Sequence, residues 1–120
     1  MPHCILELSP QVPDKPNFSA FFAELHTVLA ESGDIQLDQL KSRVRQSEHV
    51  FIGNGASDNK FVYLQISLLS GRPESLRRKW AEAAMDLLRK YFPKTIATPP
   101  ISMTVEVREM DRATHVKLTN

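Results

Sequence analysis

A proline follows the first methionine directly, and a β-prone segment begins at the next residue. If the methionine is removed, the nitrogen of Pro2 becomes a secondary amine at the end of the chain, the only such base that a ribosomal chain carries. A strand over residues 3–8 would hold this nitrogen in a defined direction. We therefore interpret Pro2 as a candidate catalytic base for proton transfer.

The composition is that of one ordinary globular domain, and it narrows the classes of function. The 120 residues include 42% hydrophobic and 24% charged side chains, which is typical of a soluble protein with its own core. No apolar run approaches the ~20 residues needed to cross a membrane, and no secretory signal is evident, so we expect a cytoplasmic protein without a membrane partner. The formal net charge of +1 gives no footprint for nucleic-acid binding.

The sequence gives little reason to expect a metal or redox site. Cys4 is the only cysteine, which excludes an internal disulfide, and the four histidines do not stand at metal-binding spacings. Cys4 falls on the apolar face of the first expected strand, so we interpret it as a small core residue.

The expected elements come in the order strand, helix, strand, and this order repeats after a turn-rich linker over residues 53–60. Alternating apolar residues indicate strands, and apolar residues three to four positions apart indicate helices. Asn17 suits the start of the first helix, and Pro73 suits the first turn of the second. The expected ranges are strands 3–8, 40–46, 61–69 and 102–109 and helices 17–32 and 73–92.

Two such units predict a single domain of the α/β (α+β) class over residues 1–120. The units span residues 1–52 and 61–110, and residues 111–120 form a C-terminal tail. Their four strands would form one sheet with both helices on one face. Because the chain has no third helix for the other face, we expect other subunits to cover it.

Cationic residues stand at two places in this scheme. Lys41, Arg43 and Arg45 share one face of the second strand, where they could bind an acid or protect a charged strand edge from aggregation. Arg72 lies in the turn before the second helix, where it could bind an acid or contact turn carbonyls and solvent. Both interpretations stay open on the residues alone.

This layout, with Pro2 at its front, resembles the tautomerase superfamily and, within it, the 5-carboxymethyl-2-hydroxymuconate isomerase family. The terminal proline and the Gly71-Arg72 turn carry most of the resemblance, which covers about the first 90 residues. It implies two fused β-α-β units per chain and assembly as a homotrimer. The matching stretches are Met1-Pro2-His3 with the Ile-Leu-Glu strand, Leu29–Gly33, Leu40–Val44, Leu64–Leu69 and the turn Gly71-Arg72 followed by Glu74-Ser75.

The resemblance also implies residue roles, with Pro2 as general base and Arg72 as the anchor of a substrate carboxylate. The family's second cation comes from the second strand, where this chain has Lys41 instead of the expected arginine, and Arg43 is the alternative. Lysine keeps the charge but lacks the planar fork that grips a carboxylate. The implied reaction is keto–enol isomerisation of a small polyanionic enol acid from aromatic degradation, without a metal or organic cofactor.

These residue types suit such chemistry. Burial and nearby cations disfavour the charged form of a secondary amine, which lowers its pKa and leaves it a free base near neutral pH. The same cations would hold the carboxylates of the substrate and stabilise the dienolate charge that develops as the proton leaves.

Two other functions stay open. A dehalogenase or decarboxylase of the same superfamily would use Pro2 as an acid and would need Glu7, Glu106 or Tyr63 to activate water. A non-enzymatic trimeric binding protein would keep the terminal proline without using it.

Overall fold

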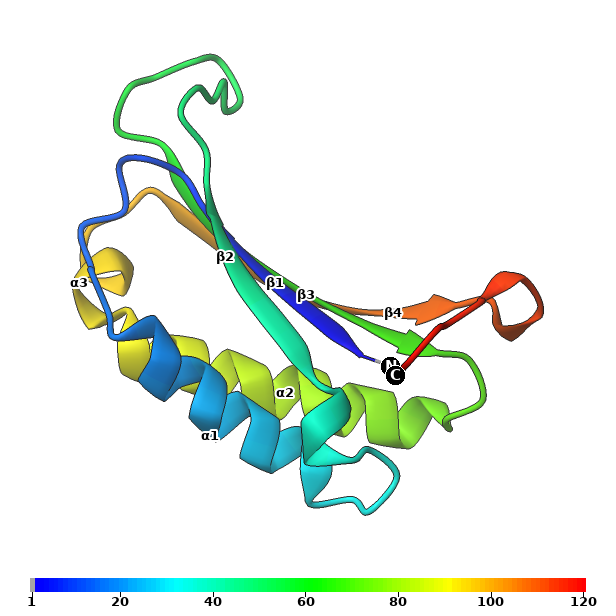
Figure 1. Ribbon diagram of the computed structural model, residues 1–120. Coiled ribbons are helices and arrows are strands. Elements are labelled where there is room, and N and C mark those ends of the chain that lie inside the picture. The colour runs from blue at the N-terminus through cyan, green and yellow to red at the C-terminus, as the bar shows by residue number, and fades with distance from the viewer. Residues whose placement is uncertain (1) are drawn as a thin grey trace.

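The computed structural model describes residues 2–120, and Met1 lies outside the described residues. Removal of Met1 therefore stays a prediction. Four strands form one sheet, and the two long helices lie together on one face of it (Figure 1). The bounds are β1 His3–Leu8, α1 Phe18–Ala30, β2 Lys41–Gln46, β3 Lys60–Leu69, α2 Glu74–Tyr91, α3 Pro93–Ile96 and β4 Ile101–Met110, with short 3₁₀ turns at Leu37–Gln39 and Arg112–Thr114.

The sheet joins the two halves of the chain through its central strands. The strand order is β2-β1-β3-β4. β1 pairs with β2, and β3 with β4, in parallel, whereas the central pair β1 and β3 is antiparallel. Each parallel pair is connected by a long helix, as a crossover between parallel strands requires. The predicted pair of β-α-β units, with both helices on one face, is confirmed.

The predicted strands and long helices are all present, with ends that differ by no more than two residues. Asn17 caps α1 as expected, because its side-chain oxygen accepts a hydrogen bond from the Ala20 N–H at 3.0 Å. The sequence interpretation missed α3, where the prolines suggested a simple break. Thr95 in this helix donates from its N–H and its hydroxyl to the buried carboxylate of Asp14, at 2.6 and 2.7 Å.

The core fills the layer between the helices and the sheet. Inward-facing side chains alternate along β1 and β3, and helical positions four apart face them from α1 and α2. Cys4 belongs to this core, as predicted, and its burial raises the pKa of its thiol to about 11. The largest fully buried side chains include Phe21, Leu25, Leu29, Leu6, Leu64, Ile66, Leu88 and Phe92.

The face of the sheet that the helices leave open is mostly polar. Lys41, Arg43 and Arg45 alternate with half-buried residues along β2, so their placement on a common face is confirmed. At the centre of this face, the Tyr63 hydroxyl donates to Glu106, which also accepts from Arg108 Nε at 3.0 Å. The open face is thus partly exposed in a single chain, as the sequence predicted.

One end of the sheet brings together the segments that carry the candidate site residues. β1 and β2 begin there, and β3 and β4 end there, because His3 lies opposite both Lys41 and Ser67. The C-terminal tail also returns to this end (Figure 1), where Lys117 Nζ donates to the side chain of Gln39. Among residues 2–120, no helix has both the length and the apolar character needed to cross a membrane.

Candidate active site at the Pro2 end of the sheet

Pro2 lies buried at the start of β1. Its carbonyl accepts a hydrogen bond from the Lys41 N–H at 3.2 Å, which ties it to the first residue of β2. β3 flanks β1 on the other side, with Ser67 opposite His3. The candidate base is therefore tied to β2 and precedes a strand that is paired on both sides, which gives it a fixed position.

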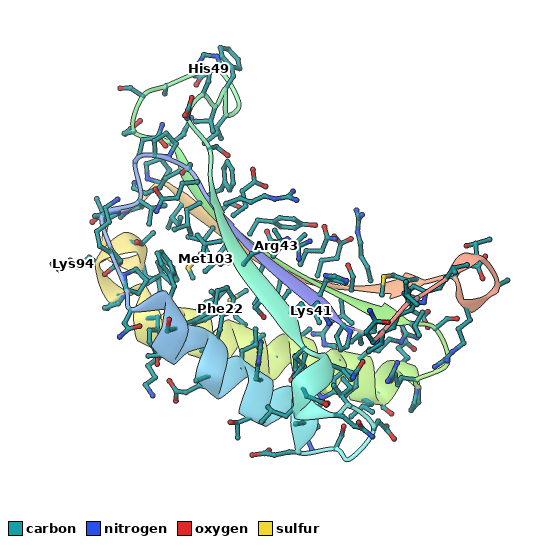
Figure 2. All side chains as sticks on the ribbon, in the orientation of Figure 1. Phe22, Lys41, Arg43, His49, Lys94 and Met103 are labelled. Atoms are coloured by element: carbon teal, nitrogen blue, oxygen red, sulfur yellow. The ribbon has the colours of Figure 1, made fainter. Side chains whose placement is uncertain are left out.

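The cations of β2 lie beside this position. Lys41 and Arg43 follow each other along the strand, with Lys41 at the end where β1 begins (Figure 2). Arg43 Nη1 lies 3.1 Å from the His3 Nδ1. Arg43 can only donate, so this contact requires an unprotonated Nδ1 on His3. Burial and the positive charges of Arg43 and Lys41 lower the pKa of His3, which favours that neutral form.

Arg72 reaches the same end of the sheet from the turn between β3 and α2. Its Nη1 donates to the Leu69 carbonyl at 2.9 Å, and its Nη2 donates to the Asp34 carbonyl at 3.3 Å. The contact with turn carbonyls that the sequence left open is therefore present. It orients the guanidinium rather than neutralising it, because both acceptors are uncharged main-chain oxygens.

A hollow of about 280 Å³ opens beside Arg72, and its lining does not include Pro2. Arg112 lines it from the C-terminal tail, where sequence reasoning gave it no role. Its Nε donates to the Ser70 carbonyl. The only hint in the sequence is topological, since the residues after β4 must emerge at the end where the parallel strand β3 stops. The lining residues are Asp34, Gly71, Arg72, Pro73 and Arg112.

Lys41 lines a different hollow, so the structure does not bring the two predicted anchors into one cavity of a single chain. This hollow of about 600 Å³ lies between α1 and the outer edge of β2. Inside it, the His26 Nε2 lies 2.6 Å from the Ser42 hydroxyl. Burial lowers the pKa of His26, so its imidazole favours the neutral form. The lining residues are Ser19, Phe22, Ala23, His26, Leu40, Lys41 and Ser42.

The residues considered for water activation lie elsewhere on the sheet. Glu7 is four positions along β1 from His3, about 13 Å at the rise of a strand, and it accepts a hydrogen bond from the Ser47 hydroxyl at 2.9 Å. Glu106 is engaged by Tyr63 and Arg108, and the Tyr63 hydrogen bond lowers the pKa of its carboxyl. Within one chain, these groups are separate from the Pro2 end.

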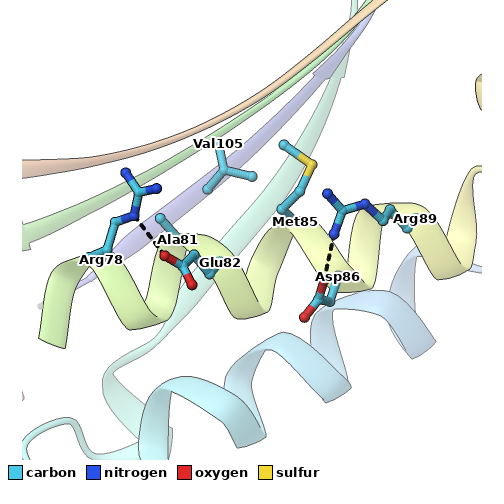
Figure 3. A pocket seen from close by; sticks show the side chains of 7 residues that line it. All are labelled: Arg78, Ala81, Glu82, Met85, Asp86, Arg89 and Val105. Carbon is cyan, nitrogen blue, oxygen red and sulfur yellow. Dashed lines mark hydrogen bonds and ion pairs between the residues drawn. The ribbon is translucent and has the colours of Figure 1, made fainter. Parts of the chain in front are cut away.

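A groove between α2 and β4 is larger than the Arg72 hollow, at about 460 Å³. Its charged side chains pair with each other, as Arg78 Nε bonds Glu82 and Arg89 Nη1 bonds Asp86, both at 2.7 Å (Figure 3). The described residues contain no group of three or more histidine, cysteine or acidic side chains that could hold a metal ion.

Comparisons with known proteins identify related sequences. A family model described as 5-carboxymethyl-2-hydroxymuconate isomerase matches residues 2–120. A 5-carboxymethyl-2-hydroxymuconate Delta-isomerase of Escherichia coli is 23% identical over 120 residues, covering 100% of this chain and 95% of that protein.

Solved structures show the same fold. A crystal structure of a 5-carboxymethyl-2-hydroxymuconate isomerase from Deinococcus radiodurans R1 aligns with a TM-score of 0.87 at 22% identity, over 99% of this chain and 90% of that one. A fused 4-OT described as a symmetric trimer aligns with a TM-score of 0.72 at 12% identity, over 98% of this chain and 92% of that one.

The four-stranded mixed sheet with two helices on one face therefore places the chain among tautomerase-like folds. Because the family model covers its length from residue 2 onward, the chain belongs to the 5-carboxymethyl-2-hydroxymuconate isomerase family. Membership in this family supports an isomerase activity.

Proposed function

We propose that the mature chain, with Met1 removed, isomerises a 2-hydroxymuconate-type enol acid from aromatic degradation, using the Pro2 nitrogen as general base. The observation that carries this proposal is the position of Pro2. It is buried at the start of β1, where its carbonyl accepts a hydrogen bond from the Lys41 main-chain N–H. Arg72 follows the end of β3 at the same end of the sheet, and the chain belongs to an isomerase family. No organic cofactor or metal takes part in the proposed steps.

The proposed reaction moves one proton. The Pro2 nitrogen takes the proton from the 2-hydroxyl of a 2-hydroxydienoate, and the electron pair shifts along the conjugated system. The protonated nitrogen then returns the proton to a distant carbon, which gives the 2-oxo-enoate and restores the free amine. Each step conserves charge within the site, and the enzyme ends as it began.

The surroundings of Pro2 favour its role as a base. Burial penalises the ammonium form, and the cations of Lys41, Arg43 and Arg72 disfavour a further positive charge. Both effects lower the pKa of the amine toward the working pH, where a general base is most effective. The same cations attract the substrate and stabilise the dienolate as it forms.

Arg72 is the main carboxylate anchor in this proposal. Its guanidinium is held by the carbonyls of Leu69 and Asp34, and such a preset fork loses little freedom when it grips an anion. Lys41 or Arg43 supplies a second cation. Arg43 has one nitrogen engaged by His3 and keeps other N–H groups for a ligand.

The decisive experiment compares two forms of the protein that differ by one residue. Cleavage of a removable tag yields either Pro2 as the first residue or one extra residue before it, with both termini checked by intact mass. Turnover of 5-carboxymethyl-2-hydroxymuconate is then followed by loss of the dienol absorbance. We expect activity only in the first form, because the extended form carries a tertiary amide that has no basicity.

Substitution provides a second arm of this experiment. Pro2→Ala should lower kcat by about a hundredfold or more, within the ~10²–10⁴ that a positioned general base contributes. Pro13→Ala, at an exposed proline of the following loop, is the matched control and should retain activity. Full turnover by the extended form or by Pro2→Ala would overturn the proposal.

A further inference from the structure

We propose that Arg72 and Arg112 together form an oxyanion site, in which Arg112 is a second anchor for a carboxylate of the substrate. This inference rests on the proposed function and specifies how the acid is recognised. Both residues line the same hollow of about 280 Å³, which suits one end of a small acid.

The hollow carries a net positive charge. Among the residues that the structure describes, the ion pairs involve Arg77, Arg78, Arg89, Lys90 and Arg108, and neither Arg72 nor Arg112. Asp34 also lines the hollow, but its bond to Arg72 runs through the main-chain oxygen. Two guanidiniums against one carboxylate leave the hollow net positive. Such a hollow concentrates anions.

Both guanidiniums of the hollow are held in place before a ligand binds. Main-chain carbonyls hold both guanidiniums: Arg72 donates to Leu69 and Asp34, and Arg112 Nε donates to Ser70. Arg112 uses only its Nε in that bond, so its terminal nitrogens are available to a ligand. Arginines already held in place lose less side-chain freedom on binding, which favours affinity.

Gly71 lines the same hollow as the two arginines. Its φ of +123° is a backbone conformation that residues with a side chain rarely adopt, and the Arg112 Nε passes 3.6 Å from the place a Cβ would occupy. The nearby carboxylate of Glu109 accepts from the Gly71 N–H at 3.3 Å and lies 3.8 Å from Arg77. Glu109 therefore already has partners, and neither is Arg112.

The position of the hollow ties it to Pro2. Arg72 and Arg112 are held by the carbonyls of Leu69 and Ser70, at the end of β3, and Ser67 in that strand lies opposite His3.

The groove between α2 and β4 differs from this hollow in how its arginines are paired. Its volume is larger, but its arginines are each bonded to a carboxylate of the same helix (Figure 3).

The test measures binding without turnover. cis,cis-Muconate is a conjugated dianion that lacks the 2-hydroxyl, and sorbate is a monoanion with the same diene. Isothermal titration of the Met1-free protein should give tighter binding of muconate than of sorbate. Arg112→Gln should weaken muconate binding by roughly ten- to a hundredfold, as expected for lost hydrogen bonds to a charged group.

Three controls keep this test decisive. Arg78→Gln removes an equal charge from an exposed, paired arginine of α2 and should retain the preference for muconate. Arg112→Lys should fall between the parent and Arg112→Gln, because it keeps the charge and loses the fork. Muconate should also shift the amide resonance of Gly71 in the unsubstituted protein, a readout that needs no variant.

The inference is overturned if Arg112→Gln binds muconate as the parent does, or if the Gly71 resonance does not move at saturation. Its failure differs from failure of the proposed function. The proton-transfer proposal fails if Pro2→Ala keeps full turnover, whereas muconate binding is measured with no reaction and does not use the Pro2 nitrogen as a base.

Discussion

The Lys41 main-chain N–H donates to the Pro2 carbonyl, so the candidate base lies next to the first residue of β2. The Lys41 side chain is exposed and offers a compact charge rather than a fork. Lysine at this position differs from the arginine that the family resemblance implies, and it would supply charge without the planar fork. Arg43, which is bonded to His3, has the fork but lies two residues further from Pro2.

This arrangement predicts how substitutions at Lys41 change substrate binding. Lys41→Gln should raise KM for 5-carboxymethyl-2-hydroxymuconate on the order of fivefold, because an exposed ion pair contributes about 1 kcal/mol at most. Lys41→Arg should lower KM, since it restores a bidentate donor. Steady-state kinetics of the Met1-free protein provide the measurement.

Lys79→Gln is the control, because Lys79 is an exposed lysine of α2 and its loss changes the net charge equally. An unchanged KM in Lys41→Gln would show that Lys41 does not touch the substrate. The second anchor would then be sought in Arg43 or Arg112.

At the scale of elements, a hydrogen bond between the side chains of His26 and Ser42 links α1 to β2. The His26 Nε2 lies 2.6 Å from the Ser42 hydroxyl, and burial lowers the pKa of the imidazole. The unfolded chain returns His26 to its ordinary value of 6.5. Below that pH, the unfolded state binds more protons than the folded state does, so the free energy of unfolding decreases as pH falls.

We therefore expect urea unfolding midpoints that are constant above pH 7.5 and decline from about pH 6.5 toward pH 5.5. His26→Asn keeps a hydrogen-bonding side chain without the titration, so its decline should be smaller. It should not vanish, because the pKa of His3 is lowered as well. Equal declines in both proteins would show that His26 does not contribute to the pH dependence.

The elements themselves could be predicted from the sequence, because alternation and helical spacing are local patterns. The strand over 61–69 and the cap at Asn17 are examples. The helix α3 was missed because its support comes from Asp14, far away in the chain. The position of Arg112 was missed for the same reason, since its partner Ser70 is 42 positions away. The pairing of long-range side chains is decided by tertiary packing, which local periodicity does not record.

The candidate site was predictable only in part. The terminal proline pointed to Pro2 and the family resemblance implied Lys41 and Arg72, and strand topology explains why all three lie at one end of the sheet. The sequence did not indicate that Arg72 and Lys41 face separate hollows.

The single chain leaves one face of its sheet uncovered. Ile5, Phe61 and Tyr63 lie half-buried on this face, although no element of the described chain packs over it. Both outer strands, β2 and β4, also have an unpaired edge, and open edges are usually protected or paired. The homotrimer that the family resemblance implies would cover this face, and this assembly stays a prediction.

Sedimentation equilibrium at micromolar concentration should therefore give three times the chain mass of 13.6 kDa. Ile5→Lys should shift the protein toward the monomer, because it places a charge on the half-buried face beside Arg43, its neighbour in β2. Thr27→Lys, on an exposed position of α1, is the matched control and should remain trimeric. A parent protein that sediments as a monomer would contradict the trimer. If, in addition, that monomer turned over its substrate fully, the two hollows of one chain would suffice for the site, and no neighbouring subunit would be needed to complete it.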